Sequence, residues 1–215
     1  MFNKNDLNFI VSNPNLIFNF TNTIPQSLLQ DINNFEWDKL LWNKIGFSEV
    51  EFQSTGGWYR NYDFNTDSMT PNFVKELKQI ALDRFSSIPD NIVSNVSSLE
   101  SYAIMSDVDY PSCKHEIHQD GAELGGRWSM LFHLVGTEGP TEFYDNFFNK
   151  KCIKSFDFLP GQLIIFPSLY PHKGVPQFKD KRITIDYIFH IDCSYNKYIL
   201  DSSLTLKNKY QQYYL

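Results

Sequence analysis

The chain has 215 residues, of which 42% are hydrophobic and 16% aromatic, so it is too apolar for a disordered protein and long enough to bury one core. A formal net charge of −6 argues against a protein that mainly neutralises nucleic-acid phosphates, because that task needs a basic face. Three cysteines without a C-x-x-C pair, no signal-peptide pattern and no apolar run of membrane-spanning length lead us to expect a soluble, cytoplasmic protein of cellular or viral origin, with no membrane partner.

The first third of the chain is predicted to be helical around one early strand. The short apolar run at 16–20 indicates the strand, and Pro25 begins a helix whose apolar residues recur at helical spacing: Leu28, Leu29, Ile32 and Phe35. A second helix is expected over 70–85, with Thr70 as N-cap and Pro71 at the first helical position. Its apolar stripe contains Phe73, Leu77, Ile80, Ala81 and Phe85. Such stripes pack against a core, so we assign them no chemistry.

From about residue 97 the sequence changes to short β-rich runs separated by turns, at 99–105, 128–135, 141–145, 154–159, 162–167 and 182–191. Regular short strands of this kind predict a sandwich or jelly roll, with the helices covering one face of a sheet. No repeat or linker divides the chain. We therefore expect one domain over 1–215, with a helix-rich support (1–96), a jelly-roll part (97–192) and a tyrosine-rich C-terminal segment (193–215) whose role stays open.

Three polar residues are candidates for a metal site. On a strand, residues two apart point to the same side, so His118 and Asp120 can direct an imidazole and a carboxylate to one point. His172 follows an apolar strand and lies in a proline-flanked turn that can aim it at the same point. Two histidines and one carboxylate form the facial triad of non-haem Fe(II) oxygenases, which leaves positions open for a co-substrate and O₂. His115 and His190 fit surface or hydrogen-bonded positions better.

The last clear strand, 182–191, alternates polar and apolar residues. Arg182, Thr184 and Asp186 share one face, which we predict to point into the barrel. A buried arginine is costly unless an anion meets it, and a planar guanidinium suits a carboxylate bound through two hydrogen bonds. Thr184 could donate another hydrogen bond to the same carboxylate. The alternative is an ordinary ion pair between Arg182 and an acid such as Asp186.

The order of these residues resembles the 2-oxoglutarate/Fe(II)-dependent dioxygenases, and within them the prolyl 4-hydroxylase-like branch, over about 102–191. The resemblance implies an α+β fold with a double-stranded β-helix (jelly roll, cupin-like) core and the N-terminal helices packed on one face. It implies that His118, Asp120 and His172 bind Fe(II), and that Arg182 and Thr184 hold the distal carboxylate of 2-oxoglutarate. It further suggests Tyr110 and His133 as co-substrate contacts.

The implied reaction consumes O₂ and 2-oxoglutarate, releases succinate and CO₂, and hydroxylates a substrate. We expect a prolyl or similar residue of a protein or peptide, or a free amino acid. Because relatives that halogenate replace the carboxylate ligand with a small residue, Asp120 favours hydroxylation. A nucleic-acid dealkylase is the first alternative, but that branch has a second arginine where this chain has Ile188. A non-catalytic cupin-like binding protein is the second, and it would have no need of the triad or of Arg182.

The aromatic segment 56–64 is the candidate for substrate binding. Trp58, Tyr59 and Arg60 can line a substrate groove or fold over it as a lid, whereas buried packing is the alternative. Glycine pairs at 56–57 and 125–126 would permit hinge movements. If these residues touch substrate, Trp58→Ala or Arg60→Ala should impair turnover and leave iron and 2-oxoglutarate binding nearly intact.

Overall fold

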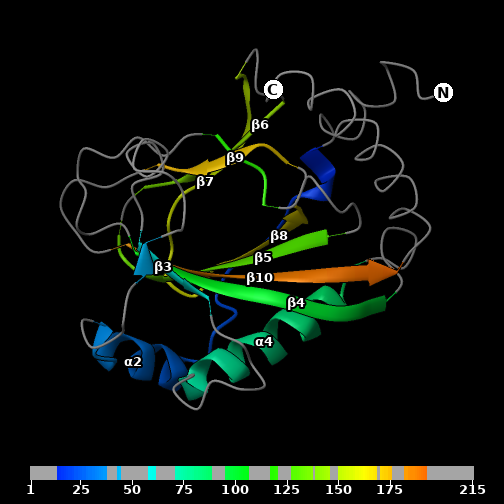
Figure 1. Ribbon diagram of the computed structural model, residues 1–215. Helices are drawn as coiled ribbons and strands as arrows, with labels where there is room; N and C mark the ends of the chain where they lie inside the picture. Colours follow the sequence, from blue (N-terminus) through cyan, green and yellow to red (C-terminus); the bar gives the residue numbers. More distant parts are fainter. Residues whose placement is uncertain are drawn as a thin grey trace.

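The computed structural model describes residues 14–37, 43–44, 58–61, 71–88, 95–106, 117–120, 127–137, 139–145, 150–168, 170–175 and 182–192. Within these ranges the chain forms two facing antiparallel sheets, with two helices beneath the larger one (Figure 1). A short 3-10 helix, Pro14–Leu16, precedes the first strand. Both the sheet-dominated α+β class and the jelly-roll arrangement predicted from the sequence are confirmed.

The larger sheet has seven strands in the order β1-β8-β5-β10-β4-β3-β2. Their bounds are β1 Phe18–Phe20, β2 Asn43–Lys44, β3 Trp58–Asn61, β4 Asn95–Ser106, β5 Arg127–Val135, β8 Leu163–Pro167 and β10 Ile183–Asp192. The smaller sheet has the order β7-β6-β9, with β6 Thr141–Tyr144, β7 Cys152–Phe156 and β9 His172–Gly174. Several neighbours in the order, such as β1 with β8 and β10 with β4, are far apart in sequence, so the sheets bring distant segments together.

Helices α2 (Gln26–Asn34) and α4 (Asn72–Phe85) cover the outer face of the larger sheet, as predicted (Figure 1). The predicted stripes are the faces that pack: Leu28 and Ile32 of α2 and Phe73, Leu77, Ala81 and Phe85 of α4 are buried, together with Val74. The hydroxyl of Tyr187 on β10 also donates a hydrogen bond of 2.6 Å to the carbonyl of Val74.

The start of α4 differs from the prediction by one residue. Pro71 is the N-cap and not the first helical residue, because its ψ of 141° is extended and its carbonyl accepts a bond from the N–H of Val74. No side chain caps this end. Thr70, the predicted cap, lies outside the described residues.

Strand β10 shows why the two faces of the larger sheet differ. Its apolar residues, Ile183, Ile185, Tyr187 and Phe189, are fully buried in the same cluster as the helices. Successive side chains point to opposite faces, so the alternating polar residues face the smaller sheet. A second apolar cluster occupies part of the space between the sheets, and contains Leu16, Ile17, Leu131, Phe143, Ile164, Phe166 and Tyr170. Leu131 and Phe166 of this cluster also line the polar pocket described below.

Strands β2 and β3 were not predicted, since the first third was expected to be helical around one strand. β3 pairs with β4 from Trp58↔Ser106 to Asn61↔Ala103, and thereby extends the larger sheet. Residues 58–60, predicted to bind substrate, thus form part of a sheet strand, while their side chains and the two glycine pairs lie outside the described residues. The C-terminal segment 193–215 is also outside them. In the described part of the chain, no helix has the length and apolarity needed to cross a membrane.

Candidate metal centre

His118 and His172 are held beside each other by their own backbones. The N–H of each donates to the carbonyl of the other, both at 2.9 Å, which forms an isolated antiparallel bridge. His172 is the first residue of β9, whereas residues 117–120 form an extended segment with this single bridge and no regular strand. The two imidazole rings consequently lie 4.5 Å apart between centroids, although 53 residues separate them in the chain, roughly a quarter of its length.

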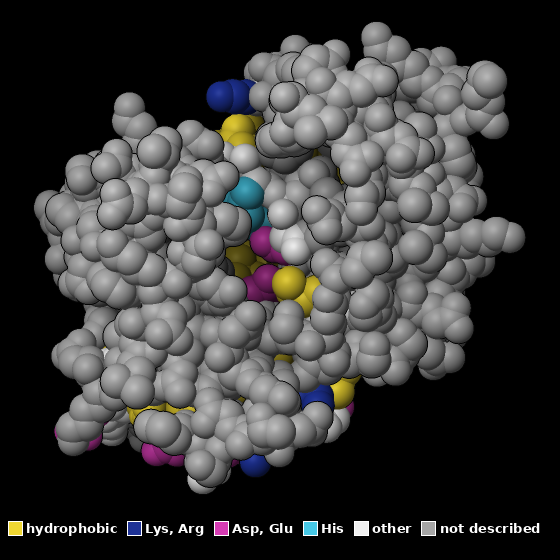
Figure 2. Space-filling model, in the orientation of Figure 1, with side chains coloured by type: hydrophobic (Ala, Val, Ile, Leu, Met, Phe, Trp, Pro, Cys, Tyr) yellow, Lys and Arg dark blue, Asp and Glu magenta, His cyan; other side chains and the backbone are white. Residues whose placement is uncertain are grey.

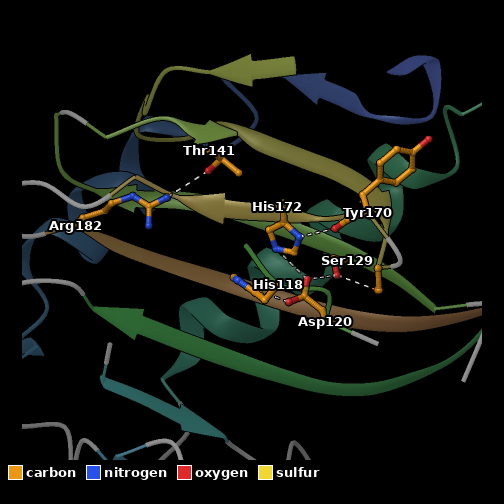
Figure 3. Close-up of polar contacts among 8 residues, drawn as sticks. His118, Asp120, Ser129, Thr141, Tyr170, His172 and Arg182 are labelled. Atoms are coloured by element: carbon orange, nitrogen blue, oxygen red, sulfur yellow. Dashed lines mark hydrogen bonds and ion pairs between the residues drawn. The ribbon is translucent and has the colours of Figure 1, made fainter. Parts of the chain in front are cut away.

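Asp120 completes a group of three possible ligands. Its Oδ1 lies 3.5 Å from Nε2 of His118, and its Oδ2 lies 3.3 Å from Nε2 of His172 (Figure 3). One ligand atom from each residue lies within 4.8 Å of the other two. The side chain of His172 is 7% exposed, that of Asp120 15% and that of His118 44%, so the group opens to solvent on the His118 side.

Hydrogen bonds outside the group orient two of its members. Nδ1 of His172 lies 2.9 Å from the carbonyl of Tyr170, which can only accept, so Nδ1 carries the proton and Nε2 presents its lone pair to the centre. Ser129 donates to Oδ2 of Asp120 at 2.8 Å and lies 2.9 Å from the hydroxyl of Ser168. The backbone N–H of Asp120 donates to the carbonyl of Ser168 at 3.1 Å.

The geometry and the chemistry of these donors fit a divalent metal ion. Ligands at about 2.1 Å from one ion and at right angles to each other lie about 3.0 Å apart. The two separations between histidine and aspartate, 3.3 and 3.5 Å, end on different oxygens of Asp120 and are slightly longer, and the three donor atoms lie within 4.8 Å of one another. Two imidazoles and one carboxylate leave positions of an octahedral ion open for further ligands.

The three residues lie in a pocket that also contains the polar face of β10. Its lining is His118, Asp120, Leu131, Thr141, Phe166, His172, Gly174, Arg182, Thr184 and Asp186. Figure 2 shows a hollow in which histidine and acidic side chains are visible from outside. The prediction that the polar face of this strand points into the barrel is therefore confirmed.

Arg182 is 4% exposed and is held on several sides. One of its terminal nitrogens donates to Oγ1 of Thr141 at 3.3 Å (Figure 3), and its guanidinium carbon lies 5.2 Å from the centre of the Phe158 ring. Gly174 lies so close that a Cβ there would be 2.6 Å from one terminal nitrogen. A buried cation thus stands in the same pocket as the metal-ligand group, in a place that a carboxylate can reach.

Asp186 is a second carboxyl group in this pocket, 6% exposed. Burial and, next, the negative charge of Asp120 raise the pKa of Asp186 well above its ordinary value. Asp186 is outside the group of three possible ligands among the described residues. A carboxyl that stays protonated avoids two adjacent negative charges in one buried pocket.

His133 is buried on β5 and does not line the pocket. Its Nε2 lies 3.0 Å from Oγ1 of Thr141, and its ring stacks on Phe158 at 4.2 Å between centroids. Burial, followed by the charge of Arg182, lowers the pKa of His133 to about 3, so the imidazole is neutral. The sequence suggested His133 as a co-substrate contact, but the structure puts Thr141 between His133 and Arg182. Tyr110 lies outside the described residues.

The residues of the site that were missed in the sequence include Ser129, Thr141, Phe158 and Gly174. Ser129, Thr141 and Phe158 act through contacts between segments far apart in sequence, and no local pattern marks them. Gly174 did carry a signal, because a glycine two residues after a ligand on a strand often marks a close approach by another group.

No protein-family model matches the sequence, and no curated protein does either. Solved structures do match. A prolyl-4-hydroxylase of Pseudomonas putida is 14% identical, covers 86% of this chain and 98% of its own, and has a TM-score of 0.59. A prolyl hydroxylase of Trichoplax adhaerens, in complex with a hypoxia inducible factor peptide fragment, is 16% identical with 94% of both chains covered and a TM-score of 0.55.

The non-haem alpha ketoglutarate dependent epimerase SnoN from nogalamycin biosynthesis is 9% identical, covers 87% of this chain and 83% of its own, and has a TM-score of 0.59. At such low identities the similarity establishes the fold. The chain shares the fold of these three enzymes, in agreement with the resemblance found in the sequence.

Proposed function

We propose that this protein is an Fe(II)- and 2-oxoglutarate-dependent dioxygenase. The observation that carries the proposal is the presence of a His118-Asp120-His172 donor group and the buried Arg182 in one pocket. Neither feature alone would suffice, since groups of polar side chains and buried arginines both occur for structural reasons. Their combination matches the needs of a metal ion and of a co-substrate that has a carboxylate at each end.

Each residue has a defined task in this proposal. His118, Asp120 and His172 hold Fe(II), and Arg182 binds the distal carboxylate of 2-oxoglutarate through two hydrogen bonds. Bound Fe(II) would supply the redox chemistry by which O₂ converts 2-oxoglutarate into succinate and CO₂ and gives one oxygen atom to the substrate. Thr184 is 1% exposed, and its hydroxyl has no hydrogen-bond partner in the described part of the chain, so it is available to the same carboxylate.

The other residues of the pocket orient these groups and limit the access of water. Ser129 holds one oxygen of Asp120, and the carbonyl of Tyr170 fixes the ring of His172. Phe166 packs edge-on to His172 at 4.8 Å between centroids and is fully buried. The pocket therefore has an apolar wall behind the ligands, and its open side is at His118, where we place the entry of the substrate.

The proposed reaction is hydroxylation of a prolyl or similar residue of a protein or peptide, or of a free amino acid. It is supported by the fold shared with two prolyl hydroxylases, one of them in complex with a peptide. We assign Trp58, Tyr59 and Arg60 to substrate binding and Tyr110 to the co-substrate, as the sequence suggests. The fold shared with SnoN makes a small-molecule substrate the second candidate, with an outcome other than hydroxylation.

The test is a turnover assay with Fe(II), 2-oxoglutarate and O₂ against peptides, free amino acids and small molecules. We expect succinate to form with one substrate class and that substrate to gain 16 daltons, the mass of one oxygen atom. Asp120→Ala is the matched control and should form no succinate. Succinate without a mass gain on the substrate would favour the second candidate. Equal succinate from wild type and Asp120→Ala would refute the proposed function.

A further inference from the structure

Arg182 stands at one end of a row of polar side chains that runs away from the pocket. One of its terminal nitrogens donates to Oγ1 of Thr141 at 3.3 Å, and Oγ1 lies 3.0 Å from Nε2 of His133. On the far side of His133, the amide nitrogen of Gln162 donates to Oδ1 of Asn19 at 2.9 Å. Thr141 is 1% exposed and His133 fully buried. Such a row is costly inside a protein unless its members satisfy one another.

The direction of the hydrogen bonds in this row can be worked out from its ends. A guanidinium only donates, so Thr141 accepts from Arg182. At the other end, Gln162 uses its amide nitrogen on Asn19, which leaves its oxygen to face His133. The side chain of Gln162 raises the pKa of His133, as an acceptor of a proton from the ring does.

The influence of Gln162 therefore favours the tautomer of neutral His133 with its proton on Nδ1. Nδ1 of His133 and Oε1 of Gln162 each have no hydrogen-bond partner in the described part of the chain. In that tautomer Nε2 has the lone pair and accepts the proton of the Thr141 hydroxyl. The three hydrogen bonds of the row then run in one direction, away from Arg182.

The direction of these hydrogen bonds gives the two threonines of the pocket, Thr141 and Thr184, different roles. The only proton of the Thr141 hydroxyl is used on His133, so Thr141 cannot donate to a carboxylate in the pocket. Thr184 has its hydroxyl proton available. Phe158 strengthens the arrangement, because it packs against both the guanidinium of Arg182 and the ring of His133.

We propose that Thr141 and His133 are positioning residues, which set the place of the Arg182 guanidinium for 2-oxoglutarate without touching the co-substrate. This inference rests on the function proposed above and adds the mechanism by which the arginine keeps its geometry. A bidentate contact needs a fixed plane of the guanidinium, since both hydrogen bonds must be in range together. Thr141 fixes one edge of that plane, and His133 fixes the hydroxyl of Thr141.

The experiment measures binding of 2-oxoglutarate and of pyruvate to Mn(II)-loaded protein by calorimetry. Pyruvate is the control probe, because it can chelate the metal but lacks the distal carboxylate that Arg182 would bind. Thr141→Val removes the hydroxyl at nearly constant volume, and Thr141→Ser keeps it. Thr23→Val is the matched protein control, since Thr23 is also buried but donates to the backbone carbonyl of Gly161, outside the pocket.

We expect Thr141→Val to bind 2-oxoglutarate about tenfold more weakly, as for the loss of a hydrogen bond to a charged group, with pyruvate and Mn(II) binding unchanged. Thr141→Ser and Thr23→Val should bind 2-oxoglutarate as the wild type does. His133→Phe keeps the stacking on Phe158 but removes Nε2, and should weaken 2-oxoglutarate binding in the same sense. The double variant with Thr141→Val and His133→Phe should bind 2-oxoglutarate about as weakly as Thr141→Val alone, because both changes break the same row of hydrogen bonds.

Three results would overturn this inference. Wild-type affinity for 2-oxoglutarate in both Thr141→Val and His133→Phe would show that the row does not position Arg182. Equal weakening of pyruvate binding would show general damage to the pocket. If the two changes weakened 2-oxoglutarate binding additively, Thr141 and His133 would act independently of each other. A wild-type protein that binds Mn(II) but no 2-oxoglutarate would instead refute the proposed function, and the two failures are thus distinguishable.

Discussion

Gly174→Ala is expected to weaken co-substrate binding through a steric effect that the structure specifies. A Cβ at this position would lie 2.6 Å and 2.9 Å from the two terminal nitrogens of Arg182 and 3.0 Å from its guanidinium carbon. Gly174 is not among the described glycines with positive φ, so alanine can adopt its backbone conformation. The change therefore acts on Arg182 and leaves the strand itself unstrained.

The size of the effect follows from the movement that the new methyl group forces. Ordinary van der Waals contact begins at 3.4 Å, so the nearest nitrogen must move by about 0.8 Å. Such a shift would lengthen a hydrogen bond of about 2.9 Å to about 3.7 Å, outside the usual range. Loss of one hydrogen bond to a charged group costs about 1.5–3 kcal/mol, which corresponds to about a ten- to hundredfold rise in Kd for 2-oxoglutarate.

The assay is calorimetric titration of the metal-loaded variant with 2-oxoglutarate, alongside thermal unfolding. Gly161→Ala is the matched control, because Gly161 has a φ of +84° and the atoms nearest to its Cβ would be in the side chains of Leu29 and Ile24, at 3.4 Å or more. We expect this control to lose about 1–2 kcal/mol of stability from backbone strain and to keep its affinity for 2-oxoglutarate. Gly174→Ala should keep its stability and bind 2-oxoglutarate more weakly.

Wild-type affinity for 2-oxoglutarate in Gly174→Ala would refute the reasoning, because it would mean that the guanidinium can move by that distance without cost or does not bind the co-substrate. A fall in melting temperature with parallel loss of metal binding would also count against it. In that case the methyl group would have displaced β9 and His172 with it.

Three further predictions concern the same pocket. Arg182→Lys keeps the charge but loses the planar geometry, so 2-oxoglutarate affinity should fall while metal affinity persists; equal affinity for 2-oxoglutarate would disprove the role of Arg182. Ser129→Ala removes the hydrogen bond to Asp120 and should weaken metal binding about tenfold or more in a chelator competition, whereas Ser87→Ala, at an exposed hydroxyl, should not. The pKa of His133 is about 3 in the folded protein and about 6.5 in the unfolded chain. The free energy of unfolding should therefore decrease as the pH falls from about 6.5 to about 3, by up to about 1.4 kcal/mol per pH unit. In urea unfolding, His133→Gln should lose less stability over this pH range than the wild type.

The parts of the fold that could be predicted from the sequence are those with a strong local pattern. Along 182–189 each second residue is apolar, and the structure buries Ile183, Ile185, Tyr187 and Phe189 against the helices while the polar residues face the pocket. The helical stripe of 72–85 was equally clear. In both cases a periodic pattern dictates which face is buried, and the tertiary structure agrees with it.

The parts that could not be predicted depend on contacts between distant segments. β2 and β3 have two and four residues, which is too short for any periodicity, and they are strands because the long β4 provides an edge for β3. In the site, the metal ligands follow a spacing that can be read from the sequence, whereas Ser129 and Thr141 acquire their roles only when β5, β6 and β10 are assembled. The mutual backbone hydrogen bonds of His118 and His172 likewise form only when distant segments of the chain come together.

The most direct test of the proposed dioxygenase is whether 2-oxoglutarate binding depends on an occupied metal site. Calorimetry of the wild-type protein should give one divalent metal ion per chain, and one 2-oxoglutarate per chain when the metal is bound. His172→Ala should lose metal binding and, with it, tight binding of 2-oxoglutarate, because His172 supplies the most buried of the three ligands. A metal-loaded wild-type protein that binds no 2-oxoglutarate would contradict the proposed function.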